Sequence, residues 1–181
     1  MVEIKNVILD LDNTLIYAEP TEDFDFNNKD SIKNLELLKN HNMDGYYIVF
    51  ERPGVQEFLD DLFKNYNVSV WTAATKNYAL FVIKNVILAN PDRKLDYIFF
   101  YYHCGISKKN YKTDKKLDLL WNKFKLEGYN KDNTLIIDDN IDVIKANPNN
   151  SIQIEAFDIN NKNSEKDNDL QRVFKKLKTM E

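Results

Sequence analysis

Residues 7–15, which read VILDLDNTL, decide how this chain folds. An apolar run leads into two aspartates, Asp10 and Asp12, and this predicts a buried strand that ends where its carboxylates reach the surface. Two carboxylates at this spacing can face one site, where one attacks a substrate or holds a metal and the other handles a proton. The same pattern also occurs in plain turns in which Asp and Asn bond their own backbone. Taken alone, it leaves both interpretations open.

Length and composition indicate one intracellular domain. The chain has 181 residues, of which 43% are hydrophobic, so it can bury one sizeable core and we expect a single domain over residues 1–181. Its net charge of −4 argues against direct nucleic-acid binding. A single cysteine, Cys104, rules out internal disulfides and suits a reducing compartment. We expect no signal peptide and no membrane span, and therefore a soluble protein.

Short strand-like segments alternate with helical patterns. Strands are predicted at residues 6–10, 46–51, 68–71, 97–102 and 134–138, which are rich in β-branched or aromatic residues. Helices are predicted from Pro53 to about residue 66 and at residues 77–89, 117–124 and 170–177. This alternation predicts an α/β, Rossmann-like parallel sheet with helices on both faces and its site at the carboxyl ends of the strands.

Two polar stretches do not fit this pattern. Residues 19–45 are rich in Asn, with a short helix near 32–38, and follow directly after the Asp-x-Asp turn. They form either a flap over the site or a mobile loop. Residues 158–169 are expected to be a charged linker that leads to the C-terminal helix.

A second acidic pair ends a second predicted strand. Residues 134–140, TLIIDDN, stop at Asp138 and Asp139. If both acidic strand ends share one site, the adjacent carboxylates repel each other, so the cluster needs a cation or a lysine. An all-oxygen site of this kind suits Mg²⁺.

Two further segments offer groups that bind phosphate. Residues 68–75, VSVWTAAT, predict a strand ending at the Thr72 hydroxyl and at small residues whose N–H groups can grip a phosphate oxygen. Residues 107–117 are rich in lysine, and one lysine placed among the carboxylates would offset their charge. Thr72 could instead be an ordinary threonine at a strand end. The lysines could be solvated surface residues, and we favour this interpretation for Lys108, Lys109 and Lys112.

Taken together, these motifs resemble the haloacid-dehalogenase-type phosphatases. Within them the chain is most similar to the branch that dephosphorylates the C-terminal domain of RNA polymerase II, the NLI-interacting-factor-like phosphatases, and especially to its ubiquitin-like-domain-bearing members. The resemblance spans about residues 4–157. Its motifs, in order, are residues 10–15 (DLDNTL), 52–54 (RPG), 71–73 (WTA) with 76–79 (KNYA), 115–117 (KKL) and 137–139 (IDD).

The resemblance implies a role for each matching residue. It makes Asp10 the nucleophile that forms an aspartyl-phosphate and Asp12 the acid/base. Thr72, with Ala73 beside it, would bind the phosphoryl oxygens. Lys115 would stabilise nucleophile and phosphate, with Lys116 as the fallback because the family's Lys-Asp-Leu or Lys-Pro-Leu is Lys-Lys-Leu here.

The same resemblance implies a Mg²⁺ site. Asp139 would ligate the ion together with Asp10 and the backbone carbonyl of Asp12. Asp138 would orient the lysine and a metal-bound water. Arg52 is given no catalytic role by us; apart from the resemblance, we expect it to anchor a loop near the site or pair with an acid. An enzyme that releases an alcohol needs a proton donor at position 12, whereas a dehalogenase or an ion-pumping ATPase does not use an Asp there. Asp12 therefore points to hydrolysis of a phosphomonoester.

The spacing of the motifs predicts a small flap or insert and no large cap. Thr72 follows Asp10 by 62 residues and Lys115 follows Thr72 by 43, which leaves no room for a cap domain. An open site admits phosphoserine or phosphothreonine in an extended peptide, and Tyr17 could line its groove. The resemblance suggests RNA polymerase II C-terminal repeats as substrate and a nuclear site of action. Because Asp10 lies near the start, no ubiquitin-like domain is expected.

Two alternatives stay open. One is a phosphatase for a small molecule, such as a nucleotide or sugar, or for a polynucleotide end. The other is a catalytically silent peptide-binding module with the same fold, although the joint presence of Asp10, Asp12, Thr72, Lys115 and Asp139 argues against silence.

Overall fold

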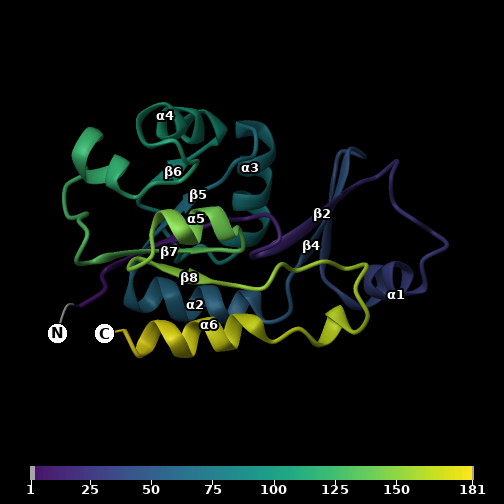
Figure 1. Cartoon of the computed structure of the whole chain (residues 1–181). Coiled ribbons are helices and arrows are strands. Elements are labelled where there is room, and N and C mark those ends of the chain that lie inside the picture. The colour runs from purple at the N-terminus through teal and green to yellow at the C-terminus, as the bar shows by residue number, and fades with distance from the viewer. Residues whose placement is uncertain (1–2, 181) are drawn as a thin grey trace.

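The centre of the protein is a five-stranded parallel sheet. The computed structural model describes residues 3–180, and its main sheet has the strand order β6-β5-β1-β7-β8 (Figure 1). The strands are β1 (Asn6–Leu9), β5 (Asn67–Trp71), β6 (Ile98–Phe99), β7 (Thr134–Asp138) and β8 (Ser151–Gln153). All four residues of the central strand β1 are buried, as expected of an apolar run in a sheet covered on both faces.

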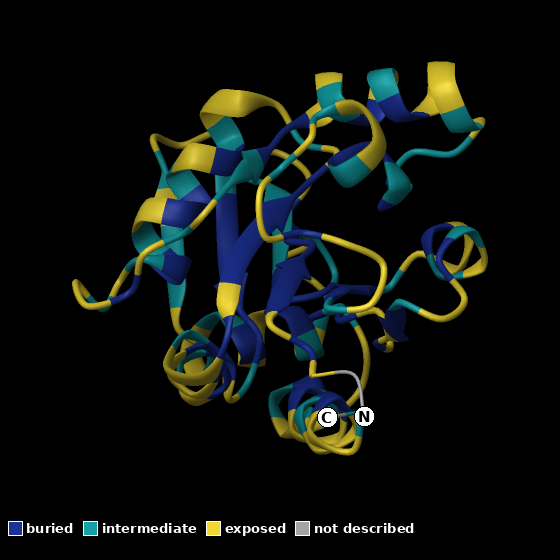
Figure 2. Cartoon of the chain, turned by 90° about the vertical axis from the view of Figure 1, so that its left-hand side faces the viewer, coloured by how far each residue is buried: buried dark blue, intermediate teal, exposed yellow. Residues whose placement is uncertain are grey.

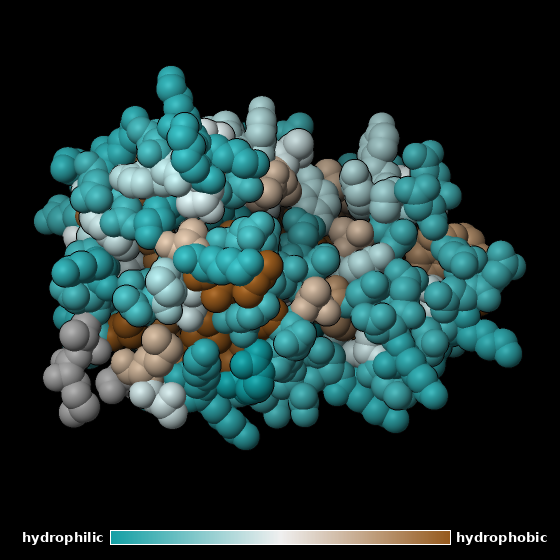
Figure 3. Space-filling model, in the orientation of Figure 1, coloured by the Kyte–Doolittle hydropathy of each residue, from teal (hydrophilic) through white to brown (hydrophobic). Residues whose placement is uncertain are grey.

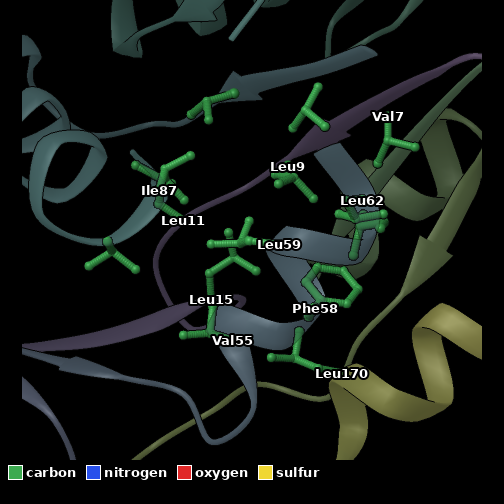
Figure 4. Close-up of a cluster of buried hydrophobic side chains, with 14 of the residues drawn as sticks. Val7, Leu9, Leu11, Leu15, Val55, Phe58, Leu59, Leu62, Ile87 and Leu170 are labelled. Carbon is green, nitrogen blue, oxygen red and sulfur yellow. The ribbon is translucent and has the colours of Figure 1, made fainter. Parts of the chain in front are cut away.

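Helices cover both faces of this sheet, which confirms the predicted α/β class (Figure 2). One face packs against α2 (Val55–Asn65), α3 (Lys76–Val82) with its π-helical continuation η1 (Ile83–Ile87), and α6 (Asp169–Lys178). The other packs against α4 (Tyr101–Tyr111), the π-helical η2 (Leu119–Lys123) and α5 (Ile141–Ala146). Val7 and Leu9 point to the first face and Ile8 to the second, and Figure 4 shows the larger core on the first face.

An antiparallel insert follows the first strand. It consists of β2 (Ile16–Pro20), β4 (Tyr47–Glu51) and β3 (Asn40–Met43) in the order β2-β4-β3, together with α1 (Lys29–Leu37). In Figure 1 it lies at the end of the molecule away from both termini. Residues 46–51 were expected in the parallel sheet, and this expectation is wrong. Residues 19–45 contain the end of β2, the helix α1 and the strand β3, joined by turns.

The predicted strand at residues 97–102 is largely wrong. Only Ile98 and Phe99 pair with β5, and the chain then turns into the unpredicted helix α4. Two contacts fix this start: the Tyr101 N–H donates to the Ala74 carbonyl (3.1 Å), and the Phe100 N–H donates to His103 Nδ1 (2.9 Å). Aromatic residues favour strands only where a pleated, half-buried surface is available, and the sheet ends here.

Residues 158–169 are more than a linker. They contain the 3-10 helix η3 (Ser164–Lys166) and pack against the insert. The buried Asn34 side chain of α1 donates to the Ile159 carbonyl and to the Ser164 hydroxyl, both at 2.8 Å. The segment before α6 therefore joins the insert to the main domain.

The face seen in Figure 3 is mostly hydrophilic, with only small apolar areas. Within residues 3–180, every helix is too short or too polar to cross a lipid bilayer.

Candidate active site

The two acidic strand ends meet at the carboxyl edge of the main sheet. Strands β1 and β7 are neighbours, with Leu9 opposite Ile137, and the Asp10 N–H donates to the Ile137 carbonyl at 3.1 Å. Asp10 therefore lies directly beside Asp138, the last residue of β7. Two apolar runs that are far apart in sequence deliver their carboxylates to one point because their strands are parallel and paired.

Three of these carboxylates form a compact cluster. One carboxylate oxygen from each of Asp10, Asp138 and Asp139 lies within 4.8 Å of the others. The Thr14 hydroxyl joins two of them, at 3.4 Å from Asp10 Oδ2 and 3.3 Å from Asp139 Oδ1. Thr14 was not among our predicted site residues, although its place four residues after Asp10 in the Asp-x-Asp-x-Thr motif was a usable signal.

Lys115 is the cation inside the cluster. It is 4% exposed, and its Nζ lies 2.5 Å from Asp10 Oδ1 and 2.8 Å from Asp138 Oδ2. Burial alone would lower the pKa of Lys115, but the two carboxylates outweigh burial and raise it, so the amine stays protonated. Lys116 points elsewhere: its Nζ donates to the Ala146 carbonyl (2.6 Å) and pairs with Asp118 (3.0 Å). The structure thus places the first of the two lysines among the carboxylates.

One lysine does not balance this cluster. Burial, followed by the charge of Asp10, raises the pKa of Asp138 to about 7 and also raises the pKa of Asp139. Both oxygens of Asp138 are engaged, one by Lys115 and one by the Asn140 N–H at 2.9 Å, whereas Asp139 has only the Thr14 hydroxyl as a side-chain partner within residues 3–180. Crowded carboxylates with excess negative charge and only oxygen donors fit a hard divalent cation such as Mg²⁺.

Asp12 lies outside this group of three carboxylates. Asn13 adopts a positive φ of 59°, which Asn tolerates better than most residues and which reverses the chain directly after Asp12. The Asp12 carboxylate instead accepts a hydrogen bond from the Tyr78 hydroxyl. Burial raises the pKa of Asp12 to about 6, against the lowering effect of that hydrogen bond. A carboxyl that titrates near neutrality suits proton transfer. Tyr78, which this geometry brings into the site, was not predicted.

Thr72 lies one strand away from Asp10. It follows β5, which pairs with β1 on the side opposite β7, and it is fully buried. Its hydroxyl accepts the Ala74 N–H at 3.0 Å, and Ala73 between them is exposed at the rim. Since β1 is flanked by β5 and β7, Asp10 lies between Thr72 and Asp138.

Tyr17 lies apart from these residues. On β2 it packs with the apolar cluster around Phe50, which also includes Phe157 and Ile159, while its neighbour Ala18 packs toward the main core. Its hydroxyl donates to Glu19 and accepts from Asn160 at 2.9 Å. The structure does not bring Tyr17 together with the carboxylate cluster.

Arg52 braces the loop that carries the first motif. It is fully buried, and its guanidinium donates to Asp167 at 2.7 and 2.8 Å. Its Nη1 also donates to the carbonyls of Thr14 (3.0 Å) and Glu155 (2.9 Å). Both expected roles, anchoring a loop and pairing with an acid, are present. Arg52 thereby ties the loop after Asp12 to the C-terminal segment.

Curated relatives carry the same kind of domain. CTD phosphatase-like protein 355R of invertebrate iridescent virus 6 is 43% identical, over 94% of this chain and 95% of that protein. Ubiquitin-like domain-containing CTD phosphatase 1 of Danio rerio is 27% identical over 70% of this chain but only 41% of its own length.

A solved structure shares the fold. Fission yeast RNA polymerase II CTD phosphatase Fcp1-R271A, bound to beryllium fluoride, superposes with a TM-score of 0.59 at 22% identity. The match covers 98% of this chain and 52% of that one, so this chain spans about half of the Fcp1 chain. The haloacid-dehalogenase-like fold expected from the sequence is thereby confirmed.

The family model described as NLI interacting factor-like phosphatase matches residues 5–181, which include every motif of the first subsection. The chain therefore belongs to the NLI interacting factor-like phosphatase family.

Proposed function

We propose that this protein is a Mg²⁺-dependent protein serine/threonine phosphatase that works through an aspartyl-phosphate on Asp10. The observation that carries the proposal is the position of Lys115, whose buried amine touches Asp10 and Asp138 while Asp139 lies within the same cluster. A phosphate ester is anionic, so attack by a carboxylate needs cationic groups at the point of reaction. Lys115 supplies one such charge.

In the first step Asp10 attacks phosphorus through a carboxylate oxygen. A bond forms between that oxygen and phosphorus, and the bond between phosphorus and the serine or threonine oxygen breaks. The electron pair goes to the leaving oxygen, which takes the proton of the Asp12 carboxyl. Lys115 and the Thr72 hydroxyl hold the phosphoryl oxygens in line during this transfer.

In the second step Asp12, now a carboxylate, accepts a proton from water. The water oxygen attacks phosphorus, the bond to Asp10 breaks, and inorganic phosphate leaves. Asp12 is protonated again and Asp10 is free. One residue acts first as acid and then as base, which its raised pKa of about 6 favours.

Asp10, Asp139 and the backbone carbonyl of Asp12 would hold Mg²⁺, and Asp138 would orient Lys115 beside it. When bound, the ion would neutralise charge on the phosphoryl group and on the attacking carboxylate. The raised pKa values of Asp138 and Asp139 support a cation here, because they reflect carboxylates whose repulsion Lys115 does not fully offset.

A phosphorylated protein segment is the substrate we favour. The only insert in residues 3–180 between the first and second motifs is the small β2-β4-β3 sheet with α1, so a phosphorylated loop or tail could reach the carboxylates. The names of the relatives point to CTD phosphatases, so RNA polymerase II C-terminal repeats, and with them a nuclear location, are the first substrate and place to test.

The primary experiment measures hydrolysis of p-nitrophenyl phosphate with Mg²⁺ and with a chelator, in wild type, Asp10→Asn and Asp12→Asn. Asp142→Asn, at an exposed carboxylate on α5, is the matched control. We expect wild type to be active with Mg²⁺ and inactive with the chelator. Asp10→Asn should be inactive, and Asp142→Asn should keep the wild-type activity. Activity that persists in the chelator and in both site variants would overturn the mechanism. A protein without any phosphatase activity that still binds peptides would be the silent module.

Substrate class is tested next. Release of phosphate from serine-phosphorylated heptad peptides is compared with release from nucleotides, sugar phosphates and 5′- or 3′-phosphorylated oligonucleotides. We expect the highest kcat/KM for the peptides. The reverse ranking would favour a small-molecule or polynucleotide-end phosphatase.

A further inference from the structure

We propose that Tyr78 is a positioning residue for Asp12, holding one carboxyl oxygen so that the other delivers the proton to the leaving group. This inference rests on the proposed function and gives a role to a residue of the 76–79 motif (KNYA) that had none. It makes the second catalytic carboxyl dependent on a side chain 66 positions along the chain.

The hydrogen bond is directional. The Tyr78 hydroxyl donates to Asp12 Oδ1, and Tyr78 is the only side chain within residues 3–180 that hydrogen-bonds to the Asp12 carboxylate. While Oδ1 accepts this bond, a proton on the carboxyl resides on Oδ2. The bond therefore selects the oxygen that reaches the substrate and limits rotation of the side chain.

Two separate elements hold the tyrosine ring itself. Tyr78 lies in the first turn of α3, whose register is fixed by the Ala79 N–H bonding to the Thr75 carbonyl at 3.0 Å. Its ring packs edge-on against Tyr47 of the insert, with ring centroids 5.4 Å apart and planes inclined by 70°. The ring is partly buried, and packing against Tyr47 and the main hydrophobic core restricts its rotamers. A group held this way can orient another with little loss of freedom during reaction.

The strand geometry explains why Asp12 needs such support. Asp10 is buried and has Lys115 and Thr14 as partners, so its orientation is set within the cluster. Asp12 comes after the strand has ended, outside that group of three carboxylates and just before the reversal at Asn13. Without Tyr78 its carboxyl would rotate among several orientations, of which only some point at the leaving oxygen.

The test compares substrates that differ in how much they need an acid. Nitrophenolate leaves readily without a proton, whereas a serine alkoxide must be protonated as it leaves. Tyr78→Phe keeps the ring and removes the hydroxyl. We expect its kcat/KM on a phosphoserine peptide to fall about tenfold or more and its kcat/KM on p-nitrophenyl phosphate to change less than about twofold, because kcat/KM reports the steps up to loss of the leaving group, before Asp12 acts as base.

The chain offers a matched control at the opposite edge of the sheet. The Tyr129 hydroxyl also donates to a carboxylate, Asp96, at 3.0 Å, and it bonds to Ser69 at 3.0 Å. Tyr129→Phe removes a comparable hydroxyl without touching the site. It is expected to lower stability but to leave the ratio of the two activities as in wild type.

A double-variant cycle completes the experiment. In an Asp12→Asn background, adding Tyr78→Phe should cause no further loss on the phosphoserine peptide, because the acid it positions is gone. Equal loss of kcat/KM on both substrates, additive losses in the cycle, or full activity of Tyr78→Phe would each overturn the positioning role while leaving the proposed phosphatase intact. A wild type inert toward every phosphomonoester would overturn the proposed function, and the positioning role with it.

Discussion

The two edges of the main sheet bury polar groups in opposite ways. At the amino edge, the Asn6 side chain donates to the Gly128 carbonyl at 3.0 Å and accepts from the Asn67 side chain at 3.0 Å, so neutral amides satisfy one another. At the carboxyl edge, Asp10 and its acidic neighbours share one buried lysine. Paired neutral groups stabilise a fold, whereas crowded like charges reduce stability and supply reactivity. The same strands thus have a structural edge and a reactive edge.

The largest expected effect is on activity at the reactive edge. Asp10→Asn removes the proposed nucleophile, so phosphatase activity should fall on the order of 10⁴-fold or more. Its free energy of unfolding should drop by less than about 1 kcal/mol, because the substitution also removes a charge that opposes Asp138 and Asp139. Activity assays and urea denaturation measure the two quantities. A variant that loses activity only because it unfolds would erase the distinction between the edges.

The second effect concerns Lys115, the lysine that offsets the negative charge of the reactive edge. Lys115→Met leaves Asp10 and Asp138 buried without a cation, so we expect a loss of about 3–5 kcal/mol in the free energy of unfolding at neutral pH. Lys116→Met is the matched control, since its amine is partly exposed and bonds to Asp118 and the Ala146 carbonyl outside the cluster, and its loss should stay below about 1 kcal/mol. Equal losses in the two variants would mean that the cluster does not depend on Lys115.

The third effect tests the structural edge. Asn6→Ala removes the buried Asn6 amide and its hydrogen bonds to Gly128 and Asn67, so the free energy of unfolding should fall by about 1–3 kcal/mol. Activity per folded molecule should stay within about twofold of wild type, because the site lies at the other end of the strand. A clear loss of kcat in fully folded Asn6→Ala would show that the two edges are coupled.

Much of the reactive edge could be predicted because its residues follow directly on strong local patterns. The strands before Asp10 and Asp138 are continuous apolar runs, and parallel pairing brings their ends together. The choice between Lys115 and Lys116 could not be made locally, since both precede the same helix and only the packed loop distinguishes them.

What sequence reasoning missed depends on contacts distant in the chain. Tyr78 reads as one more residue of a helical start, and its partner lies 66 positions away. The short strands β2 and β3 show no clear alternation of polar and apolar residues, and β4 pairs with both of them. Residues 101–111 are aromatic at first and suggest a strand, but the sheet has no place for them beyond β6.

The smallest effect is a dependence of stability on pH. In a chelating buffer, the folded-state pKa values of about 6 for Asp12 and about 7 for Asp138 exceed the ordinary value of 3.8. Between these values the folded protein binds more protons than the unfolded chain, so stability is lost as pH rises from about 4 to about 7. Asp12→Asn should remove part of this slope and become more stable relative to wild type by about 1–2 kcal/mol across that window.

Denaturation at a series of pH values between 4 and 8 measures this slope, with the exposed Asp142→Asn as the reference for removing a surface carboxylate. Mg²⁺ provides the independent arm of the test. Because a cation at the cluster would favour the ionised carboxylates, adding Mg²⁺ above pH 6 should restore stability in wild type, and less so in Asp139→Asn. A stability that instead rises from pH 4 to 7 in the chelator would mean that the carboxylates are already balanced without a metal. The charges of the reactive edge would then be as fully paired as the neutral polar groups of the amino edge.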